Sequence, residues 1–385
     1  MRLLHLSDLH IGKQVNEFPL LEDQARMLET IVGIIEEKHV DAVIIAGDVY
    51  DRSAPSADAV ACFDRFLSSV ADTGAACFII PGNHDSAERI AYASELLEKN
   101  RVHIPPVYAG SIIRRTLADE HGDVVFWLFP FLRPAHVRPF FPDEDIPDYT
   151  AAMRCAINAC DIDPTQRNVA IAHQFVTCGG KEPELSDSEL SLGGIDNVDA
   201  SVFDAFDYVA LGHIHRPQRI GRDTIRYSGS LLKYSASEIR YPKSAPLVTL
   251  GAKGDVDIEL IPLVPIRDMR EIKGPLEELV SDETIAALSE GERNDYVCVV
   301  LTDEFTPIDA LSALRAVYPN VLSISFDNTR TSTTNDAPRN VLEDADRLNP
   351  IELFERFYRE QNGAGLTESQ YETVRDALEE SEDDR

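Results

Sequence analysis

The sequence predicts an α/β protein in which two sheets pack together under covering helices, followed by a second, smaller α/β unit and a helical tail. Short apolar runs alternate with segments of helical period over residues 2–97, as expected for strands joined by right-handed crossovers. Further strand-like runs follow the break at Ile104-Pro105-Pro106 and form a second half. Polar side chains stand where strand-like runs end in both halves, so we expect the halves to surround one site.

Composition and charge limit the classes of protein to which this chain can belong. Its 385 residues are 44% hydrophobic, which is enough for one large domain plus a smaller one. The net charge of −31 provides no overall basic surface, so a nucleic-acid substrate would need metal ions and local arginines to offset it. None of the six cysteines forms a C-x-x-C pair, which argues against zinc-ribbon and thioredoxin-like proteins. The sequence shows no signal-peptide pattern and no apolar run of about 18 residues, so we expect a cytoplasmic protein without a membrane span.

The first half is expected to alternate strands and helices. The apolar-biased residues 2–7 predict a strand, and residues 20–38 predict a helix because their apolar side chains recur on one face. The nearly continuous apolar run Asp41–Ala46 is short enough for a buried parallel strand. The remaining elements expected here are a helix at 56–71, a strand at 75–80 and a helix at 87–97.

The second half is expected to contain more strands and fewer helices. A helix is expected at 148–159 and a long polar loop at 178–195. The strands are expected at 124–129, 169–172, 208–211, 224–228, 246–250 and 256–261.

A second unit begins near Pro265 and is expected to be a small α/β domain. Its elements are a strand at 267–272, a helix at 275–280, a strand at 296–301, a helix at 307–317 and a strand at 321–325. The polar, Pro-containing residues after it indicate a flexible linker. The expected boundaries are a main domain at 1–265, the small domain at 266–327, the linker at 328–348 and the tail at 349–385.

The tail is expected to form two short amphipathic helices. Asn349 suits an N-cap with Pro350 in the first turn, and Thr367 with Gln370 suits a capping box. Docking on the protein's own body remains one interpretation of their apolar faces. Docking on a partner's helices is favoured, because the linker separates the tail from the core. The apolar faces consist of Ile351, Phe354, Phe357 and Tyr358 in the first helix, and Tyr371, Val374 and Leu378 in the second.

Five short polar motifs follow the predicted strands and suggest a metal site. Their residues are Asp8 with His10, Asp48, Asn83 with His84, His173, and His213 with His215. Open α/β sheets place their sites at the carboxyl ends of strands, and alternation along a strand would put Asp8 and His10 on one face. Carboxylate, imidazole and amide oxygen suit Mn²⁺, with Mg²⁺, Fe²⁺ or Zn²⁺ as other candidates. Each motif alone is more often structural than ligating, but five in this order are poorly explained by chance.

This set of motifs (D-x-H, G-D, G-N-H-D, H and G-H-x-H) resembles the calcineurin-like metallophosphoesterase superfamily over residues 1 to 265. The resemblance implies a four-layer αββα sandwich and two divalent metal ions, with Mn²⁺ favoured. It implies that His84 donates a proton to the leaving oxygen or stabilises the transition state, with Asp85 as its orienting partner. One metal ion would be held by Asp8, His10, Asp48 and His215, and the other by Asp48, Asn83, His173 and His213.

The details of the motifs separate the chain from phosphoprotein phosphatases of this superfamily. Those enzymes carry Gly-Asp-x-x-Asp-Arg-Gly, whereas here Ser53 follows Arg52, and they carry Arg-Gly-Asn-His-Glu, whereas here Pro81 precedes Gly82. The strings around Asp8 and Asp48, and Gly212 to Gln218, look like the SbcD-type nuclease subunits of the bacterial SbcCD complex. Archaeal and eukaryotic relatives carry a His at the position that aligns with Asp51. The role ascribed to that His, shaping the DNA at the site, is therefore not assigned to Asp51.

This resemblance implies a Mn²⁺-dependent DNA nuclease that acts in DNA end processing, repair and recombination. The expected activities are a 3′→5′ exonuclease on duplex ends and an endonuclease on single strands and hairpins. The expected assembly is a homodimer, joined through the helices after Asp51 and Asp85, which forms a heterotetramer with an SbcC-type coiled-coil ATPase gripped by the tail. The small domain would face DNA. Candidate phosphate contacts, with ordinary surface roles equally open, are Arg114, Arg115, Arg133 and Arg138. A phosphodiesterase acting on small nucleotides is the alternative, and a non-catalytic scaffold for the ATPase is a third hypothesis.

Overall fold

The computed structural model describes residues 1–187, 189 and 196–328, together with short stretches of the tail at 354–355, 358–359, 365–367, 370–371 and 373–374. The chain divides into two compact units, Met1–Met269 and Arg270–Arg385. The first unit contains every residue of the expected metal site, and the second begins close to the change of pattern near Pro265.

The first sheet of unit 1 has the strand order β16-β15-β1-β4-β5-β6. Strands β1, β4, β5 and β6 run parallel, whereas β15 is antiparallel to β1 and β16 is antiparallel to β15. The parallel strands are therefore aligned, so the loops that follow β1, β4 and β5 meet at one edge. The strands are β1 (Arg2–Leu6), β4 (Ala42–Ala46), β5 (Ala76–Ile80), β6 (Val102–His103), β15 (Lys243–Leu250) and β16 (Val256–Leu263).

The second sheet has the order β13-β14-β12-β9-β8-β7. Its central strands β8, β9, β12 and β14 are parallel, and antiparallel edge strands flank them. Its strands are β7 (Ile113–Asp119), β8 (Gly122–Phe129), β9 (Arg167–His173), β12 (Tyr208–Gly212), β13 (Gln218–Ile220) and β14 (Arg222–Tyr227). Short two-stranded pairs are formed by β2 (Gln14–Val15) with β3 (Phe18–Pro19), and β10 (Phe175–Thr177) with β11 (Asn197–Asp199).

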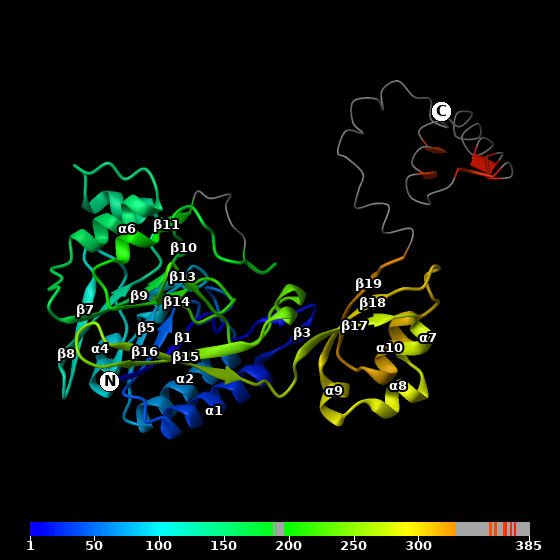
Figure 1. Ribbon diagram of the computed structural model, residues 1–385, viewed down its shortest axis with the longest axis horizontal. Helices are drawn as coiled ribbons and strands as arrows, with labels where there is room; N and C mark the ends of the chain where they lie inside the picture. Colours follow the sequence, from blue (N-terminus) through cyan, green and yellow to red (C-terminus); the bar gives the residue numbers. More distant parts are fainter. Residues whose placement is uncertain are drawn as a thin grey trace. The chain divides into compact units, whose positions relative to one another are not determined.

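The two sheets pack face to face, and helices cover their outer faces. Apolar side chains of the first sheet, such as Ile44 and Phe78, form one buried cluster with Phe126 and Ile171 of the second. Helices α1 (Leu21–Glu37) and α2 (Ala57–Asp72) lie together on one side of the sandwich, and α6 (Tyr149–Asn158) lies on the other (Figure 1). The predicted sandwich of two sheets between helical layers is confirmed.

The outer layers are completed by short helices. In this unit they are α3 (Ala87–Ile90), α4 (Ser94–Leu97), η1 (Glu98–Asn100), α5 (Pro134–Val137), η2 (Arg138–Phe140), η3 (Ala200–Phe203) and η4 (Ala236–Arg240). The single helix expected at 87–97 is wrong, because Ala93 adopts a left-handed backbone with φ 60° and divides it in two. Strand β7 was missed because its side chains alternate between half-buried and exposed, so it has no continuous apolar run.

A histidine in the core between the sheets gives unit 1 an acid-sensitive stability. His5 is fully buried, its Nδ1 lies 2.9 Å from the Tyr208 hydroxyl, and burial lowers its pKa to about 3. The unfolded chain binds a proton below about pH 6.5 and the folded chain does not, so stability is lost as the pH falls from 6.5 towards 3. In the parent chain we expect the free energy of unfolding to fall by about 2 kcal/mol between about pH 7 and about pH 5 because of His5, and in His5→Gln we expect this fall to be absent. Urea unfolding of both proteins in the presence of a chelator measures the difference. Equal pH dependence in both proteins would contradict this assignment.

The second unit contains a three-stranded sheet, β17-β18-β19, packed against helix α10. Strands β18 and β19 are parallel, and Val297, Val299 and Leu314 lie in a separate buried cluster. The expected order of strands and helices is present, with two additional short helices, α8 and α9. The elements are β17 (Met269–Gly274), α7 (Leu276–Leu279), α8 (Asp282–Ala287), α9 (Glu290–Asn294), β18 (Tyr296–Leu301), α10 (Ala310–Val317) and β19 (Val321–Phe326).

Most of the expected linker and tail lies outside the described residues, including Ile351, Phe357 and Leu378. Where the tail is described, Thr367 and Gln370 form the expected capping box. The Thr367 N–H donates to Gln370 Oε1 over 2.9 Å, and the Gln370 N–H donates to Thr367 Oγ1 over 3.4 Å.

Candidate metal centre

The candidate ligands lie on the loops that follow five parallel strands of unit 1. Asp8 and His10 follow β1, Asp48 follows β4, Asn83 follows β5, and the ligands from the second sheet follow or end β9 and β12. Asp8, His10, Asp48 and His213 all have left-handed backbones, with φ between 43° and 105°. Such strain in non-glycine residues persists only where the surrounding structure enforces it, and it is concentrated at functional sites.

Asp8 and His10 both reach the site as expected, but the expected cause, alternation of side chains along a strand, is wrong. Strand β1 ends at Leu6, and both residues lie beyond it in left-handed turns. The turn is held to the loop after β4, because the Asp8 N–H donates to Gly47 O over 3.1 Å and the His10 N–H donates to Asp48 O over 3.0 Å. Pairing between these loops, rather than alternation within a strand, brings the two side chains to the site.

Two glycines allow the ligand loops to approach one another. A Cβ atom on Gly82 would lie 2.1 Å from Asp48 Oδ1, and a Cβ on Gly212 would lie 1.9 Å from the backbone oxygen of Ala46. Both contacts are far closer than van der Waals separation, so any larger residue would push the loops apart. The glycines before Asn83 and His213 are therefore part of the construction of the site.

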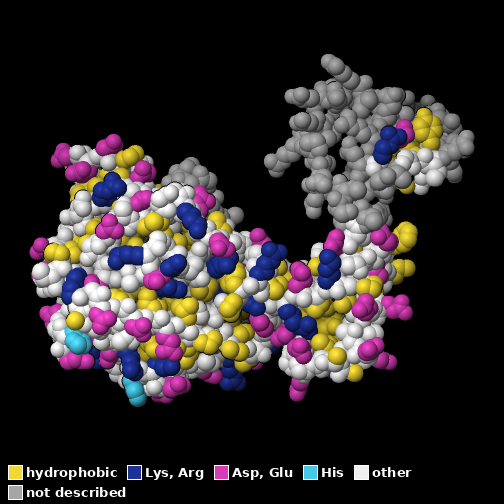
Figure 2. All heavy atoms as spheres, in the orientation of Figure 1, with side chains coloured by type: hydrophobic (Ala, Val, Ile, Leu, Met, Phe, Trp, Pro, Cys, Tyr) yellow, Lys and Arg dark blue, Asp and Glu magenta, His cyan; other side chains and the backbone are white. Residues whose placement is uncertain are grey.

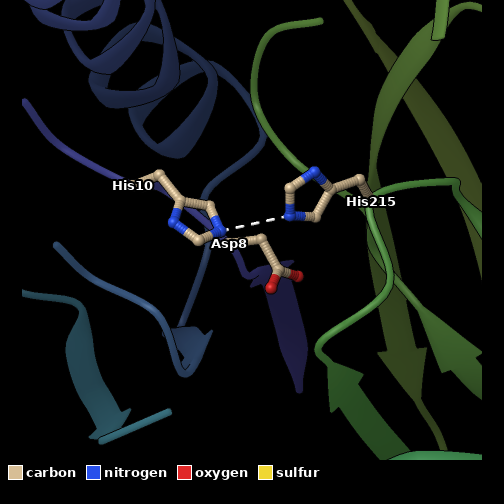
Figure 3. A group of neighbouring side chains, drawn as sticks. All are labelled: Asp8, His10 and His215. Carbon is tan, nitrogen blue, oxygen red and sulfur yellow. Dashed lines mark hydrogen bonds between the residues drawn. The ribbon is translucent and has the colours of Figure 1, made fainter. Parts of the chain in front are cut away.

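We call Asp8, His10, Asp48 and His215 the first ligand group. His10 Nε2 and His215 Nε2 face each other over 3.1 Å, and His10 Nε2 lies 3.7 Å from Asp48 Oδ2. The rings of His10 and His215 approach from opposite sides above the Asp8 carboxylate (Figure 3). One oxygen or nitrogen atom from each of Asp8, His10 and His215 lies within 4.8 Å of the others. All four side chains are buried.

We call Asp48, Asn83, His173 and His213 the second ligand group. Asn83 Oδ1 lies 2.9 Å from both His173 Nε2 and His213 Nδ1, and His173 Nε2 lies 3.3 Å from Asp48 Oδ2. His173 Nδ1 donates to the backbone oxygen of Ala46 over 2.8 Å, which leaves its Nε2 directed at the group. Asp48 stands between the two groups, because it lies near His10 on one side and His173 on the other.

The pKa values of the ligand side chains are shifted by burial and by the close approach of imidazoles and carboxylates. Burial lowers the pKa of His10 well below its usual range and that of His213 to about 3, so both imidazoles are neutral at pH 7. Burial would raise the pKa of Asp48, but the neighbouring His173 and His10 lower it far below the usual value. Burial opposes protonation of His173, yet Asp48 and Asp8 raise its pKa to about 9.

The donor set fits divalent metal ions. Imidazole nitrogens of His10 and His215 face each other. The imidazoles of His173 and His213 both face the Asn83 amide oxygen. Such electron-pair donors come this close only with protons or cations between them. Carboxylate, imidazole and amide ligands around one buried point suit borderline-hard ions. The structure thus brings together all seven residues that the sequence nominated as ligands.

His84 lies exposed at the edge of the centre. Its Nδ1 is 3.0 Å from the backbone oxygen of Asp51, and its ring is perpendicular to that of His10 with centroids 4.9 Å apart. With Nδ1 donating to that carbonyl, Nε2 is the ring nitrogen that remains for a substrate.

The expectation that Asp85 orients the His84 ring is wrong. The Asp85 carboxylate instead accepts three backbone N–H groups, from Val49 over 3.0 Å, Tyr50 over 3.0 Å and Gly82 over 2.9 Å. Asp85 therefore joins the loop after β4 to the loop after β5 and is a positioning residue. Burial raises its pKa to about 6.

A buried ion pair behind His215 was missed by the sequence analysis. The Glu238 carboxylate lies 3.4 Å from His215 Nδ1, and Lys243 Nζ donates to Glu238 Oε2 over 2.5 Å and to the His215 backbone oxygen over 2.8 Å. A carboxylate behind a ligating histidine fixes the ring and raises its basicity. Neither residue stands in a motif, so the sequence contains no signal for this pair.

Removal of the Glu238 charge is expected to weaken metal binding without removing a ligand. In Glu238→Gln, His215 loses its charged partner, and we expect Mn²⁺ affinity to fall by roughly 10- to 100-fold. Calorimetric titration with Mn²⁺ measures this effect, and thermal unfolding checks that the chain still folds around Lys243. Glu259→Gln is a matched control, because Glu259 forms only an exposed ion pair with Lys38. Unchanged affinity in a folded Glu238→Gln variant would contradict the role.

Of the four arginines nominated as phosphate contacts, Arg133 lines a cavity together with the metal-centre residues Asn83 and His213. Arg115 pairs with Glu98 at 2.7 Å, Arg138 donates to the Ile146 backbone oxygen over 2.9 Å, and Arg114 stacks on Trp127. Figure 2 shows basic and acidic side chains interspersed on the visible face of unit 1. That face therefore shows no extended basic surface that could offset the net negative charge of the chain.

Comparisons with known proteins identify the family of the chain. The fold and the ligand groups define a metallophosphoesterase, and the calcineurin-like phosphoesterase family matches residues 1–217, so the chain belongs to that family. Within it, the chain is similar to the SbcD subunit of the nuclease SbcCD from Staphylococcus epidermidis, with 30% identity over 392 residues that cover 98% of each chain. The family described as Type 5 capsule protein repressor C-terminal domain matches residues 265–362. The expected resemblance to SbcD-type nuclease subunits is confirmed.

Solved structures give weaker likenesses. A dimetal phosphatase from Danio rerio matches with 12% identity and a TM-score of 0.40, over 69% of this chain and 96% of its own. A psychrophilic beta-glucosidase from Micrococcus antarcticus matches with 12% identity and a TM-score of 0.21, over 84% of this chain and 83% of its own. Among the described residues, no helix combines the length and apolar character needed to cross a membrane.

Proposed function

We propose that this chain is a metal-dependent DNA nuclease that hydrolyses phosphodiesters at the two ligand groups. The proposed activities are 3′→5′ exonuclease action on duplex ends and endonuclease action on single strands and hairpins. The observation that carries the proposal is the convergence of all seven ligands in a chain that aligns over 98% of its length with a nuclease subunit. Mn²⁺ is the proposed metal, since its ligand preferences match this mixed donor set.

The chain's own residues have separate tasks in this proposal. Divalent ions, when bound, supply Lewis-acid stabilisation of the charge that develops on the phosphoryl group. His84 can give a proton to the leaving oxygen from Nε2 when its ring is protonated on both nitrogens, while Nδ1–H donates to the Asp51 backbone oxygen. Asp85 keeps the loops that carry Asp48 and Asn83 at their separation through its three backbone hydrogen bonds.

The proposed assembly is a homodimer that joins an SbcC-type coiled-coil ATPase into a heterotetramer. The similar protein from Staphylococcus epidermidis is named as one subunit of the nuclease SbcCD, which supports a partner for this chain. We propose that residues 349–385 grip the coiled coil, that 266–327 form a DNA-facing cap, and that DNA binding is shared with the partner. The net charge of −31 supports such sharing, because this chain alone repels a polyanion.

The test of function uses the full chain with Mn²⁺, end-labelled duplex and hairpin DNA, and cyclic nucleotides, each with and without the partner ATPase. Cleavage of DNA ends and hairpins is expected. Hydrolysis of cyclic nucleotides without DNA cleavage would instead identify a small-nucleotide phosphodiesterase. No hydrolysis of any substrate with the partner present would leave a scaffold role.

A further inference from the structure

A cavity of about 280 Å³ opens directly beside the second ligand group. We call it the base cavity. Its volume is at the lower limit for ligand pockets, which suits one planar group rather than a folded strand or a duplex. Its lining residues are Asn83, Phe131, Arg133, Tyr149, Gln174, Phe175, Asp196 and His213.

Aromatic rings form the walls of the base cavity. The Phe131 ring lies nearly parallel to that of His213, with an interplanar angle of 22° and centroids 6.3 Å apart. The buried Phe175 ring is nearly perpendicular to His213, at 80° and 6.4 Å. Tyr149, at the start of α6, adds a third aromatic side chain. Nucleobases stack on aromatic side chains whatever their identity, because every base has a π face.

Two oxygen atoms of lining residues accept no hydrogen bond within the described part of the chain. They are Gln174 Oε1, on a fully buried side chain, and Asp196 Oδ1, on a side chain that is 8% exposed. The amide of Gln174 is oriented by its Nε2, which donates to the Leu132 backbone oxygen over 3.0 Å. Buried acceptors without donors are costly in a folded protein. Both oxygen atoms are themselves buried, so a ligand in the cavity donates to them only if the side chains turn towards it.

An arginine lines the same cavity and remains exposed. The Arg133 guanidinium lies 5.5 Å from the centroid of the Phe131 ring. A cation–π contact thus holds it near the base cavity, where its N–H groups can donate to a phosphate. Aromatic walls, unpaired acceptors, a guanidinium and adjoining metal ligands together match the parts of a nucleotide.

We propose that the base cavity receives one unstacked nucleobase of the strand whose phosphodiester lies at the ligand groups. The base stacks against the aromatic walls and donates its amino or imino hydrogens to Gln174 and Asp196. The Arg133 side chain contacts a phosphate of the same strand. This inference rests on the proposed nuclease function and adds a requirement for an extruded base at the cleavage point.

The test moves a single abasic position along a short single-stranded oligonucleotide cleaved by the full chain with Mn²⁺. Cleavage at one bond adjoining the abasic position is expected to fall by about 5- to 100-fold, since a stacked base is worth that much in binding. In Phe131→Ala the difference between intact and abasic strands is expected to shrink, because one of the stacking walls is lost. Phe140→Ala, which shortens an exposed aromatic side chain outside the cavity, is expected to retain the difference.

A binding measurement separates the outcomes. Deoxyguanosine monophosphate is expected to inhibit the Mn²⁺-loaded chain about 5- to 100-fold more strongly than deoxyribose 5-phosphate, because binding of one stacked base contributes that factor. Tyr149→Ala is expected to reduce that ratio if Phe131→Ala fails to fold. Equal cleavage beside intact and abasic positions in the parent chain overturns the base cavity and leaves the nuclease proposal standing. Failure to cut any oligonucleotide, with or without the partner, overturns the nuclease proposal itself.

Discussion

Replacement of Asp48 with Asn is expected to reduce phosphodiester cleavage by about 10³-fold or more. Asp48 is the proposed bridging ligand and faces both groups, at 3.7 Å from His10 Nε2 and 3.3 Å from His173 Nε2. An amide presents one oxygen and no charge where the carboxylate presents two oxygens and a negative charge. Loss of a metal ion removes several kcal/mol of transition-state stabilisation, and each 1.36 kcal/mol is a factor of ten in rate.

The Asp48→Asn experiment combines metal titration with kinetics. Calorimetry should find weaker Mn²⁺ binding, and end-labelled DNA should remain uncut over times that exhaust it with the parent chain. Asp64→Asn, an exposed carboxylate on α2, is the matched control and should behave like the parent. The Asn oxygen can still accept from the backbone N–H of His84, as Asp48 Oδ1 now does over 2.9 Å, so the loop is expected to keep its shape. Cleavage within about tenfold of the parent would exclude a bridging role.

His84→Gln is expected to lower cleavage of DNA by about 10²- to 10⁴-fold while leaving Mn²⁺ affinity unchanged. The His84 side chain is exposed and hydrogen bonds only to the Asp51 backbone oxygen among the described residues, so its loss should not affect folding. Gln can still donate a hydrogen bond but cannot transfer a proton. The chemical step should therefore suffer, whereas the ligand groups remain intact.

A substrate with a good leaving group distinguishes proton donation from other roles of His84. An aryl phosphodiester releases a phenolate that needs no proton, so His84→Gln should cleave it at a rate much closer to that of the parent chain. His121→Gln, in an exposed turn between β7 and β8, is the matched control. Equal losses on DNA and on the aryl ester would show that His84 stabilises the transition state electrostatically instead.

Much of the fold was predictable because its elements are short and strongly patterned. The apolar runs at β4, β5 and β18 are buried on both faces, so their hydrophobicity is continuous and unmistakable. The edge strand β7 was not predictable in the same way, since one of its faces is exposed. The break at Ala93 was also missed, because alanine is a strong helix former and nothing in its residue type signals the left-handed backbone that it adopts.

The sequence by itself determined the class of the site. Asp8, His10, Asp48, Asn83, His173, His213 and His215 each stand next to a predicted strand end in an order that the superfamily shares. Parallel strands bring such positions to one edge whatever the details of the loops, so the ligands could be named before their contacts were known.

Only the tertiary structure decided how the ligands are held and what surrounds them. The pairing of the loops after β1 and β4, the three backbone contacts of Asp85, and the Glu238–Lys243 pair behind His215 join residues far apart in the chain. Gln174 and Asp196 likewise meet at one cavity without any shared motif. These features depend on distances between segments, and a one-dimensional pattern records only the order of residues along the chain.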